Sequence, residues 1–153
     1  PNVPPFGLYL ALLAYRLTDE EGEHLISRFR LSKSAAQALR DTLAIKAKLQ
    51  VLADPKLSRS SIYYLLYGYS PPAIIANSLA ADSVVARQHI QLFLNKLRYV
   101  KPSLDGEDLI RMGITPGPRI KEILQQLHEA RLDGRVINKQ DEQELVKRWL
   151  KIT

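Results

Sequence analysis

Apolar residues recur at helical spacing along almost the entire chain, and this periodicity limits the fold more than any other feature. From Ala35 to Leu49, for example, the apolar positions form a single stripe with a repeat near 3.6 residues. No stretch longer than four residues alternates between apolar and polar side chains, as a half-buried strand would. We therefore predict an all-α protein, a compact array of about eight or nine helices with no sheet.

Helix-starting residues divide this pattern into segments. Thr18 and Glu21 have the spacing of a capping box, and Ser32 is placed to cap a long helix that ends at Asp54-Pro55. Ser58 is expected to open the next helix, which Gly68 and the Ser-Pro-Pro run after it would close. The other main helices are expected at Phe6 to Leu17, where we expect burial on most faces, Ala73 to Ala81, Asp82 to about Arg98, Pro116 to Arg131 and Asn138 to Ile152.

The segment from Leu104 to Ile120 has an unusual arrangement of charges. Asp105 can cap a short helix that Gly113 stops, and Thr115 can cap the next helix, with Pro116 in its first turn. Arg119 and Lys121 then fall near the positive end of that helix, where folding favours anions. A bound anion would resolve this conflict.

Composition favours a polyanionic partner. The chain has 22 Lys and Arg against 16 Asp and Glu, a net charge of +6, and it has no Cys, so disulfides and thiolate nucleophiles are excluded. No apolar run is long enough to span a membrane, so we expect a cytoplasmic protein. The chain begins with Pro1, and its single Met is Met112, so we expect a fragment of a longer protein.

The pattern from Leu104 to Ile120, followed by Leu132-Asp133-Gly134, resembles the C-terminal region of bacterial tRNA nucleotidyltransferases. These CCA-adding or A-adding enzymes are related to poly(A) polymerase. Their motif is close to Leu-x-Gly-x-Asp-Leu-Ile-x-x-Gly-x-x-Pro-Gly-Pro-x-Ile. Upstream, the stretch from Ser61 to Leu66 resembles a Ser-x-x-Tyr-x-Leu-Leu helix of the longer members. The resemblance covers roughly Leu8 to Lys151.

The resemblance implies that the catalytic residues belong to an N-terminal head outside this chain. In relatives that head carries a Gly-Ser and an Asp-x-Asp pair that binds two metal ions, and neither occurs here. A nucleotide-selecting Glu-Asp-x-x-Arg segment follows in relatives, and we expect this chain to lack it. We therefore expect no catalytic residue and no cofactor in this chain, because Mg²⁺ and ATP or CTP would belong to the head of the same polypeptide. Residues 1–100 would form a body-like region, and residues 101–153 a tail-like region with the Gly-Pro turn. In relatives these two parts grip the acceptor stem and the elbow of tRNA.

The candidate RNA phosphate-binding residues surround the expected turn. They are Gly117, Arg119, Lys121, Arg111 and Lys101. Gly117 would allow close backbone approach, much as a helix-hairpin-helix turn does. No metal site is expected, since His24, His89 and His128 fall on different helices and are best explained as structural. Capping of first turns explains the acidic clusters, including the one at Asp141-Glu142-Glu144.

A second interpretation remains open at this point. The apolar helix Phe6 to Leu17 and the tyrosines between Tyr63 and Tyr69 could dock another chain, as in a helical protein-interaction or dimerisation domain. Such tyrosines can also stack on nucleobases, although packing between helices is their commoner role. The sequence leaves open whether the parent protein adds CCA, adds only A, or polyadenylates.

Overall fold

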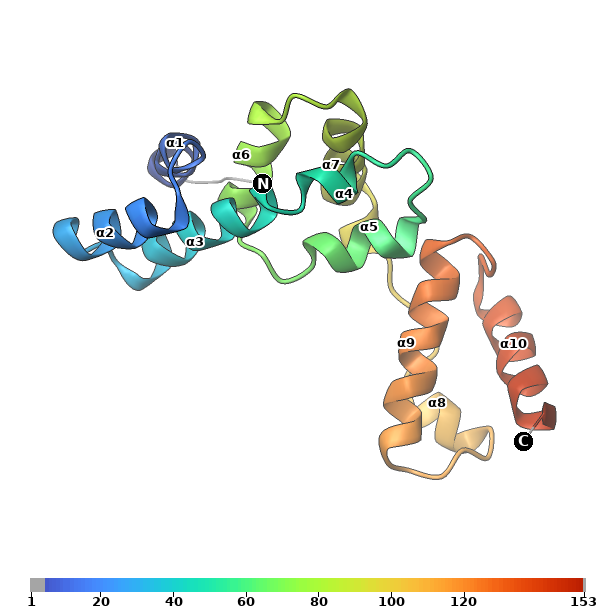
Figure 1. The fold of residues 1–153 in the computed structure, drawn as a ribbon. Helices are drawn as coiled ribbons and strands as arrows, with labels where there is room; N and C mark the ends of the chain where they lie inside the picture. Colours follow the sequence, from blue (N-terminus) through green and yellow to red (C-terminus); the bar gives the residue numbers. More distant parts are fainter. Residues whose placement is uncertain (1–4, 153) are drawn as a thin grey trace. The chain divides into compact units, whose positions relative to one another are not determined.

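A computed structural model describes residues 5–152 of the chain, and the side chains of residues 7–151 (Figure 1). Within these residues the protein consists of ten α-helices and one short 3-10 helix, with no strand, which confirms the all-α prediction. Eight of the α-helices are eight residues or longer. None of the described helices is long and apolar enough to cross a membrane.

The chain forms two compact units. The first comprises residues 1–57 and 61–98, and the second comprises residues 58–60 and 99–153. The sequence predicted a body-like region over residues 1–100 and a tail-like region over residues 101–153. In the second unit, Ser60 donates its backbone N–H and its hydroxyl to the Asp133 carboxylate, at 2.9 and 2.8 Å.

The first unit contains seven helices. They are α1 (Pro5–Ala14), α2 (Asp19–Phe29), α3 (Lys33–Lys46), α4 (Leu49–Leu52), α5 (Arg59–Leu66), α6 (Pro71–Ala80) and α7 (Val84–Asn95), of which α5 begins in the second unit. In Figure 1, α1 to α3 are blue to cyan, and α5 to α7 are green to olive. Two starts are as predicted: Thr18 and Glu21 form a reciprocal capping box on α2, and the Ser32 side chain accepts from the Ala35 N–H at the start of α3.

Several predicted boundaries in this unit were wrong. The helix after Ser32 ends at Lys46, and α4 is a separate single turn. Pro71 and Pro72 form the first turn of α6 and do not end the segment before it, which is consistent with the pre-set φ of proline. Ser83, not Asp82, caps α7, which ends at Asn95.

The first helix is also less buried than predicted. It ends at Ala14, and the side chains of Tyr9 and Leu13 are 67% and 73% exposed. Only one side of α1 therefore faces the core, at Ala11 and Ala14. The side chain of Phe6, where the prediction began, lies outside the described residues.

The centre of the first unit combines apolar packing with buried polar groups. Helix α3 packs against α1, α2 and α6. The fully buried Asn77 of α6 donates its amide to the carbonyls of Thr42 and Ala73, at 3.1 and 2.9 Å. Asp41 of α3 accepts the N–H of Ser70, the residue before α6, at 2.8 Å. The bonds from Asn77 to Thr42 and from Ser70 to Asp41 hold α6 on α3, because separating the helices would leave these buried groups without partners.

The second unit is a three-helix assembly. It contains α8 (Gly106–Arg111), α9 (Pro118–Leu132) and α10 (Lys139–Ile152), and the 3-10 helix η1 (Leu97–Tyr99) crosses from the first unit. Its core gathers apolar side chains from all three helices and from the segments on either side of α8. Leu104, Leu109, Ile114, Ile123, Leu127 and Val146 are buried, with Trp149 packed against them. Figure 1 shows α8 beside the first turns of α9.

Candidate nucleic-acid interface

The first half of the candidate site is the short helix α8, which begins as the sequence predicted. Asp105 accepts the Asp108 N–H at 2.9 Å, and Asp108 accepts the Asp105 N–H at 3.0 Å. This bond from the backbone N–H of Asp105 lowers the pKa of Asp108, with help from the charges of Lys139 and Arg111. The helix stops before Gly113, which has φ +101°, as expected for a left-handed stop.

The turn that joins α8 to α9 differs from the prediction. Helix α9 begins at Pro118 and not at Pro116, and Gly117, not Thr115, occupies its N-cap. Gly117 has φ +144° and ψ −162°, a conformation that is essentially restricted to glycine. The space around it is open, because a Cβ built there would meet no atom within 4 Å. The turn therefore presents exposed backbone at the start of a fifteen-residue helix.

Arg119 and Lys121 lie where the sequence placed them, close to the positive end of this helix. They are the second and fourth residues of α9, and both are exposed. The first turn of α9 has no acidic residue, whereas the first turns of α8 and α10 each have two. Helix α9 thus has cations in the turns where the other two helices of this unit have acidic residues.

Arg111 ends α8, on the other side of the same turn. Its guanidinium lies 3.6 Å from Glu107 and 3.5 Å from Asp108, and its side chain remains 73% exposed. These three residues have the Glu-Asp-x-x-Arg spacing of the nucleotide-selecting segment, so the expectation that the chain lacks this spacing was wrong. Here the carboxylates belong to the first turn of α8, and the Asp108 carboxylate is engaged in its capping box.

Lys101 does not join the other candidates. The carbonyl of its neighbour Val100 lies 2.9 Å from Nε2 of His128, near the opposite end of α9. His128 is nine residues beyond Arg119, which corresponds to roughly 14 Å along a helix. Arg111, Arg119 and Lys121 therefore flank the turn, and Lys101 lies apart from it, although it is exposed.

A buried ion pair that the sequence did not reveal fixes the rest of this unit. Glu142 of α10 is fully buried, and its carboxylate accepts from Arg131 Nε and from the N–H groups of Ser103 and Leu104. Arg131 also donates to the Ile137 carbonyl and to the Ser103 hydroxyl. The assignment of Glu142 to helix capping was therefore wrong. Its spacing of four residues from the buried Val146 is the signal that could have identified it.

The histidines and tyrosines have mainly structural partners. His89 Nδ1 lies 2.8 Å from the Leu52 carbonyl, and His128 Nε2 lies 2.9 Å from the Val100 carbonyl. His24 is exposed. Within residues 5–152 no three His, Asp or Glu side chains gather closely enough to hold a metal ion. Tyr63 is buried, but Tyr64 and Tyr67 are exposed, so the tyrosine cluster is only partly core.

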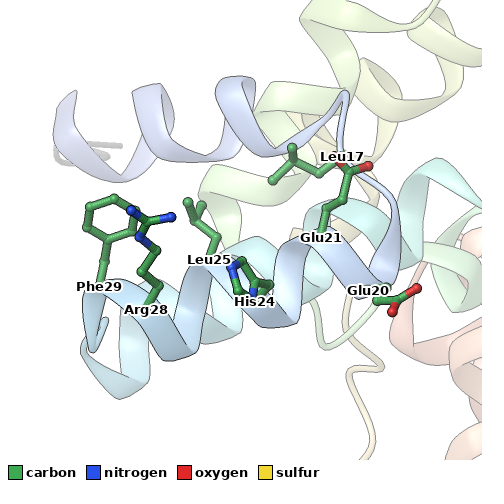
Figure 2. Close-up of a pocket in the computed structure, with 7 residues that line it drawn as sticks. All are labelled: Leu17, Glu20, Glu21, His24, Leu25, Arg28 and Phe29. Carbon is green, nitrogen blue, oxygen red and sulfur yellow. The ribbon is translucent and has the colours of Figure 1, made fainter.

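A groove of about 760 Å³ lies along α2 in the first unit (Figure 2). Leu17, Leu25 and Phe29 give it apolar surface, and the remaining lining residues are Glu20, Glu21, His24 and Arg28. The Glu21 carboxylate is already engaged with the N–H of Thr18, which lowers the pKa of Glu21. Charges of both signs at this groove do not select a particular ligand.

The fold and the turn define an all-helical protein whose most distinctive element is the α8–α9 hairpin. Comparison with known proteins then identifies the family. Residues 8–145 match the family model described as tRNA nucleotidyltransferase domain 2, putative. The chain therefore belongs to the tRNA nucleotidyltransferase family and corresponds to its C-terminal region, as the motifs indicated.

Two curated relatives agree with this assignment. The A-adding tRNA nucleotidyltransferase of Geobacter sulfurreducens is 34% identical over 153 residues, which cover 96% of this chain and 17% of the relative. The A-adding tRNA nucleotidyltransferase of Deinococcus radiodurans is 42% identical over 53 residues, which cover 34% of this chain and 12% of the relative. The chain thus spans less than a fifth of either relative. No solved structure matches it.

Proposed function

We propose that this chain is the non-catalytic part of a tRNA nucleotidyltransferase that grips tRNA through phosphate contacts at the α8–α9 turn. The observation that carries the proposal is the pair of exposed cations, Arg119 and Lys121, at the start of α9, whose first turn contains no acidic residue. A tRNA phosphate would be attracted both by these cations and by the positive end of the helix. Arg111 would add a weaker contact, and Lys101 would contact a different phosphate.

Gly117 would serve this site by having no side chain. Its backbone is exposed at the N-cap of α9, so a phosphate could approach the helix start without meeting a Cβ. Pro118 has no N–H, and the Ile120 N–H donates to the Gly117 carbonyl at 3.1 Å. Side-chain cations would therefore contribute much of the attraction in this proposal.

The chemistry of nucleotide addition would lie in a catalytic head of the same polypeptide, with Mg²⁺ and a nucleoside triphosphate. Both relatives are named as A-adding enzymes, which favours addition of A over synthesis of a complete CCA end or a poly(A) tail. In this proposal the present chain positions the tRNA and takes no part in the transfer step itself.

The test is equilibrium binding of the purified chain to tRNA at salt concentrations from about 50 to 200 mM, a range over which phosphate contacts weaken strongly. Arg119→Ala should weaken binding by roughly 1 kcal/mol, about fivefold, and lower the salt slope by about one. Lys151→Ala is the matched control, because Lys151 is an exposed cation in the last turn of α10, where the helix dipole favours it.

The thermal stability of the Arg119 variant separates a phosphate site from a structural residue. A cation near a helix start contributes nothing favourable to folding, so the melting temperature should barely change. Unchanged tRNA binding together with a melting temperature several degrees lower would make Arg119 structural and would refute the proposed site. Gly117→Val should also reduce binding, although its positive φ adds backbone strain to the loss of access.

The alternative is a protein-docking role for the first unit. The exposed apolar side chains Tyr9 and Leu13 of α1, and Phe29 of α2, are the observations that favour it. Sedimentation velocity of the chain at increasing concentration tests this alternative. Docking would be favoured over RNA recognition if the chain self-associates, if Leu13→Ser abolishes this self-association, and if the affinity for tRNA does not change with salt concentration.

A further inference from the structure

The positive charge of this protein is concentrated in one part of the sequence. Residues 55–104 contain six Lys and Arg but a single acidic residue, Asp82, so this third of the chain carries +5 of the net +6. None of α5, α6 and α7 contains an acidic residue. A polyanion that approaches these helices therefore meets no acidic side chain on them.

An ordered group of aromatic rings lies in the same region. The rings of Tyr63 and Tyr67 are stacked, with centroids 5.3 Å apart and planes 22° apart. The Tyr63 ring also contacts Phe93 of α7 at 5.7 Å and Tyr64 edge-on at 5.2 Å. Tyr63 and Phe93 are buried, whereas Tyr67 is 65% exposed. Tyr67 is thus the outer ring of a stack that is anchored in the core.

One cationic side chain, that of Lys48, lies beside the end of α5, which Tyr67 follows directly in the chain. Lys48 Nζ lies 4.7 Å from the centre of the Tyr69 ring and 3.4 Å from the Leu65 carbonyl, beside the end of α5. Lys96, which is exposed, follows Phe93 by three residues at the end of α7. Proteins hold unpaired nucleotides by combining an open aromatic ring, which stacks on the base, with nearby cations, which attract the backbone.

We propose that Tyr67 is a stacking platform for an unpaired RNA nucleobase, a second RNA contact in addition to the turn before α9. This inference rests on the proposed function, because it requires that the chain binds tRNA. The ring is already ordered against Tyr63, so a base that stacks on Tyr67 immobilises little additional side chain. Residues 61–98 of the first unit contain three Lys and Arg against one acidic residue, which favours RNA over a protein partner.

The experiment compares two RNA ligands of equal phosphate number, a hairpin with an unpaired loop and a blunt duplex. Tyr67→Ala should weaken binding of the looped RNA about tenfold, the scale of one lost base stack, and change duplex binding less than twofold. The salt slope should stay the same, because stacking releases no counterions. Tyr67→Phe keeps the ring and should bind as the parent does.

Tyr9→Ala is the matched control, because Tyr9 is 67% exposed, almost the same as Tyr67, and lies on α1. Equal effects of Tyr9→Ala and Tyr67→Ala, or a Tyr67→Phe variant as weak as Tyr67→Ala, would overturn the platform. So would a change in the sedimentation of the protein caused by Tyr67→Ala, which would assign the ring to an interface between copies.

The platform and the proposed function fail in different ways. If Arg119→Ala lowers the salt slope but Tyr67→Ala leaves the affinity for the looped RNA unchanged, the platform is wrong and phosphate recognition stands. If Tyr67→Ala weakens looped RNA while Arg119→Ala has no effect, the platform stands and the turn is not the phosphate site. A chain that binds neither RNA would overturn both.

Discussion

A single carboxylate, that of Glu142, connects three segments of the second unit. It joins the start of α10 to the end of α9 through Arg131, and to the segment before α8 through the N–H groups of Ser103 and Leu104. The Arg131 side chain is 18% exposed, so the pair is largely shielded from water. Removing one partner of such a pair leaves the other charge and several N–H groups without their acceptor.

We therefore predict that Glu142→Ala lowers the free energy of unfolding by roughly 3 kcal/mol. Urea denaturation followed by the fluorescence of Trp149 would measure this change, because Trp149 is the only Trp in the chain and packs against the core of the second unit. Glu23→Ala, followed by circular dichroism because Glu23 lies in the first unit, is the control: the bond of Glu23 to Arg40 is also short, at 2.7 Å, but its side chain is 56% exposed. Equal losses for the two variants would contradict the prediction.

The contrast between Arg119 and Glu142 shows which residues can be located from the sequence. The position of Arg119 in a helix start follows from neighbouring residues, because caps and prolines act over one turn. The partners of Glu142 lie 11 and 38 to 39 residues away in the chain, so no local pattern identifies them. Only the occurrence of a carboxylate on an apolar helical stripe hints at such a pairing.

At the scale of elements, α2 approaches α3 closely because Gly22 has no side chain. A Cβ at Gly22 would lie 2.9 Å from methyl carbons of Leu39 and of Leu43, both of which are buried. A larger side chain would have to displace these leucines from the core around Ala14. The contact between the two helices therefore depends on the absence of side-chain atoms at one position.

Gly22→Val should lower the free energy of unfolding by about 2 kcal/mol, because overpacking a closed core costs about 1 to 3 kcal/mol. Urea denaturation followed by circular dichroism provides the measurement. Ser27→Val places the same side chain on an exposed position of α2, and it should change stability by no more than about 0.5 kcal/mol. A stable Gly22→Val variant would show that α2 does not pack on α3 as described.

Helix starts were predictable where a side chain caps its own helix, and less so elsewhere. The caps at Thr18, Ser32 and Asp105 follow directly from local spacing. Before α9, however, the sequence offers a hydroxyl at Thr115, but the chain begins the helix two residues later than predicted, at Pro118. The pre-set φ of Pro118 and the unusual backbone of Gly117 determine that start, and a hydroxyl in the sequence does not reveal it.

At the scale of the whole molecule, the motifs identified the family, whereas composition indicated only a polyanionic partner. The longest motif of the resemblance lies in the α8–α9 hairpin, where the sequence must satisfy a cap, a left-handed stop and a glycine-only conformation within a few residues. Such multiple requirements leave a recognisable pattern. The stacked tyrosines and the local surplus of positive charge impose no fixed spacing, so they became interpretable only with the structure.

The absence of a Gly-Ser and an Asp-x-Asp pair from all 153 residues leads to a prediction about activity. The isolated chain, incubated with tRNA, ATP, CTP and Mg²⁺, should incorporate no nucleotide, because two-metal transfer needs clustered carboxylates to hold the ions. Radiolabelling of the tRNA 3′ end is the measurement, and a full-length A-adding enzyme serves as the positive control. Labelled tRNA produced by this chain alone would contradict the assignment of the chemistry to a separate head.

The backbone conformation of Gly117 limits which mutations this position can accept during evolution. Its combination of φ +144° and ψ −162° is open to glycine alone. Any single-base change in the glycine codon that substitutes another amino acid adds a Cβ. No amino-acid substitution at this position is therefore expected to be neutral. At positions 119 and 121, a change between Arg and Lys keeps the positive charge. At position 117, by contrast, any substitution disturbs the turn and with it the start of α9.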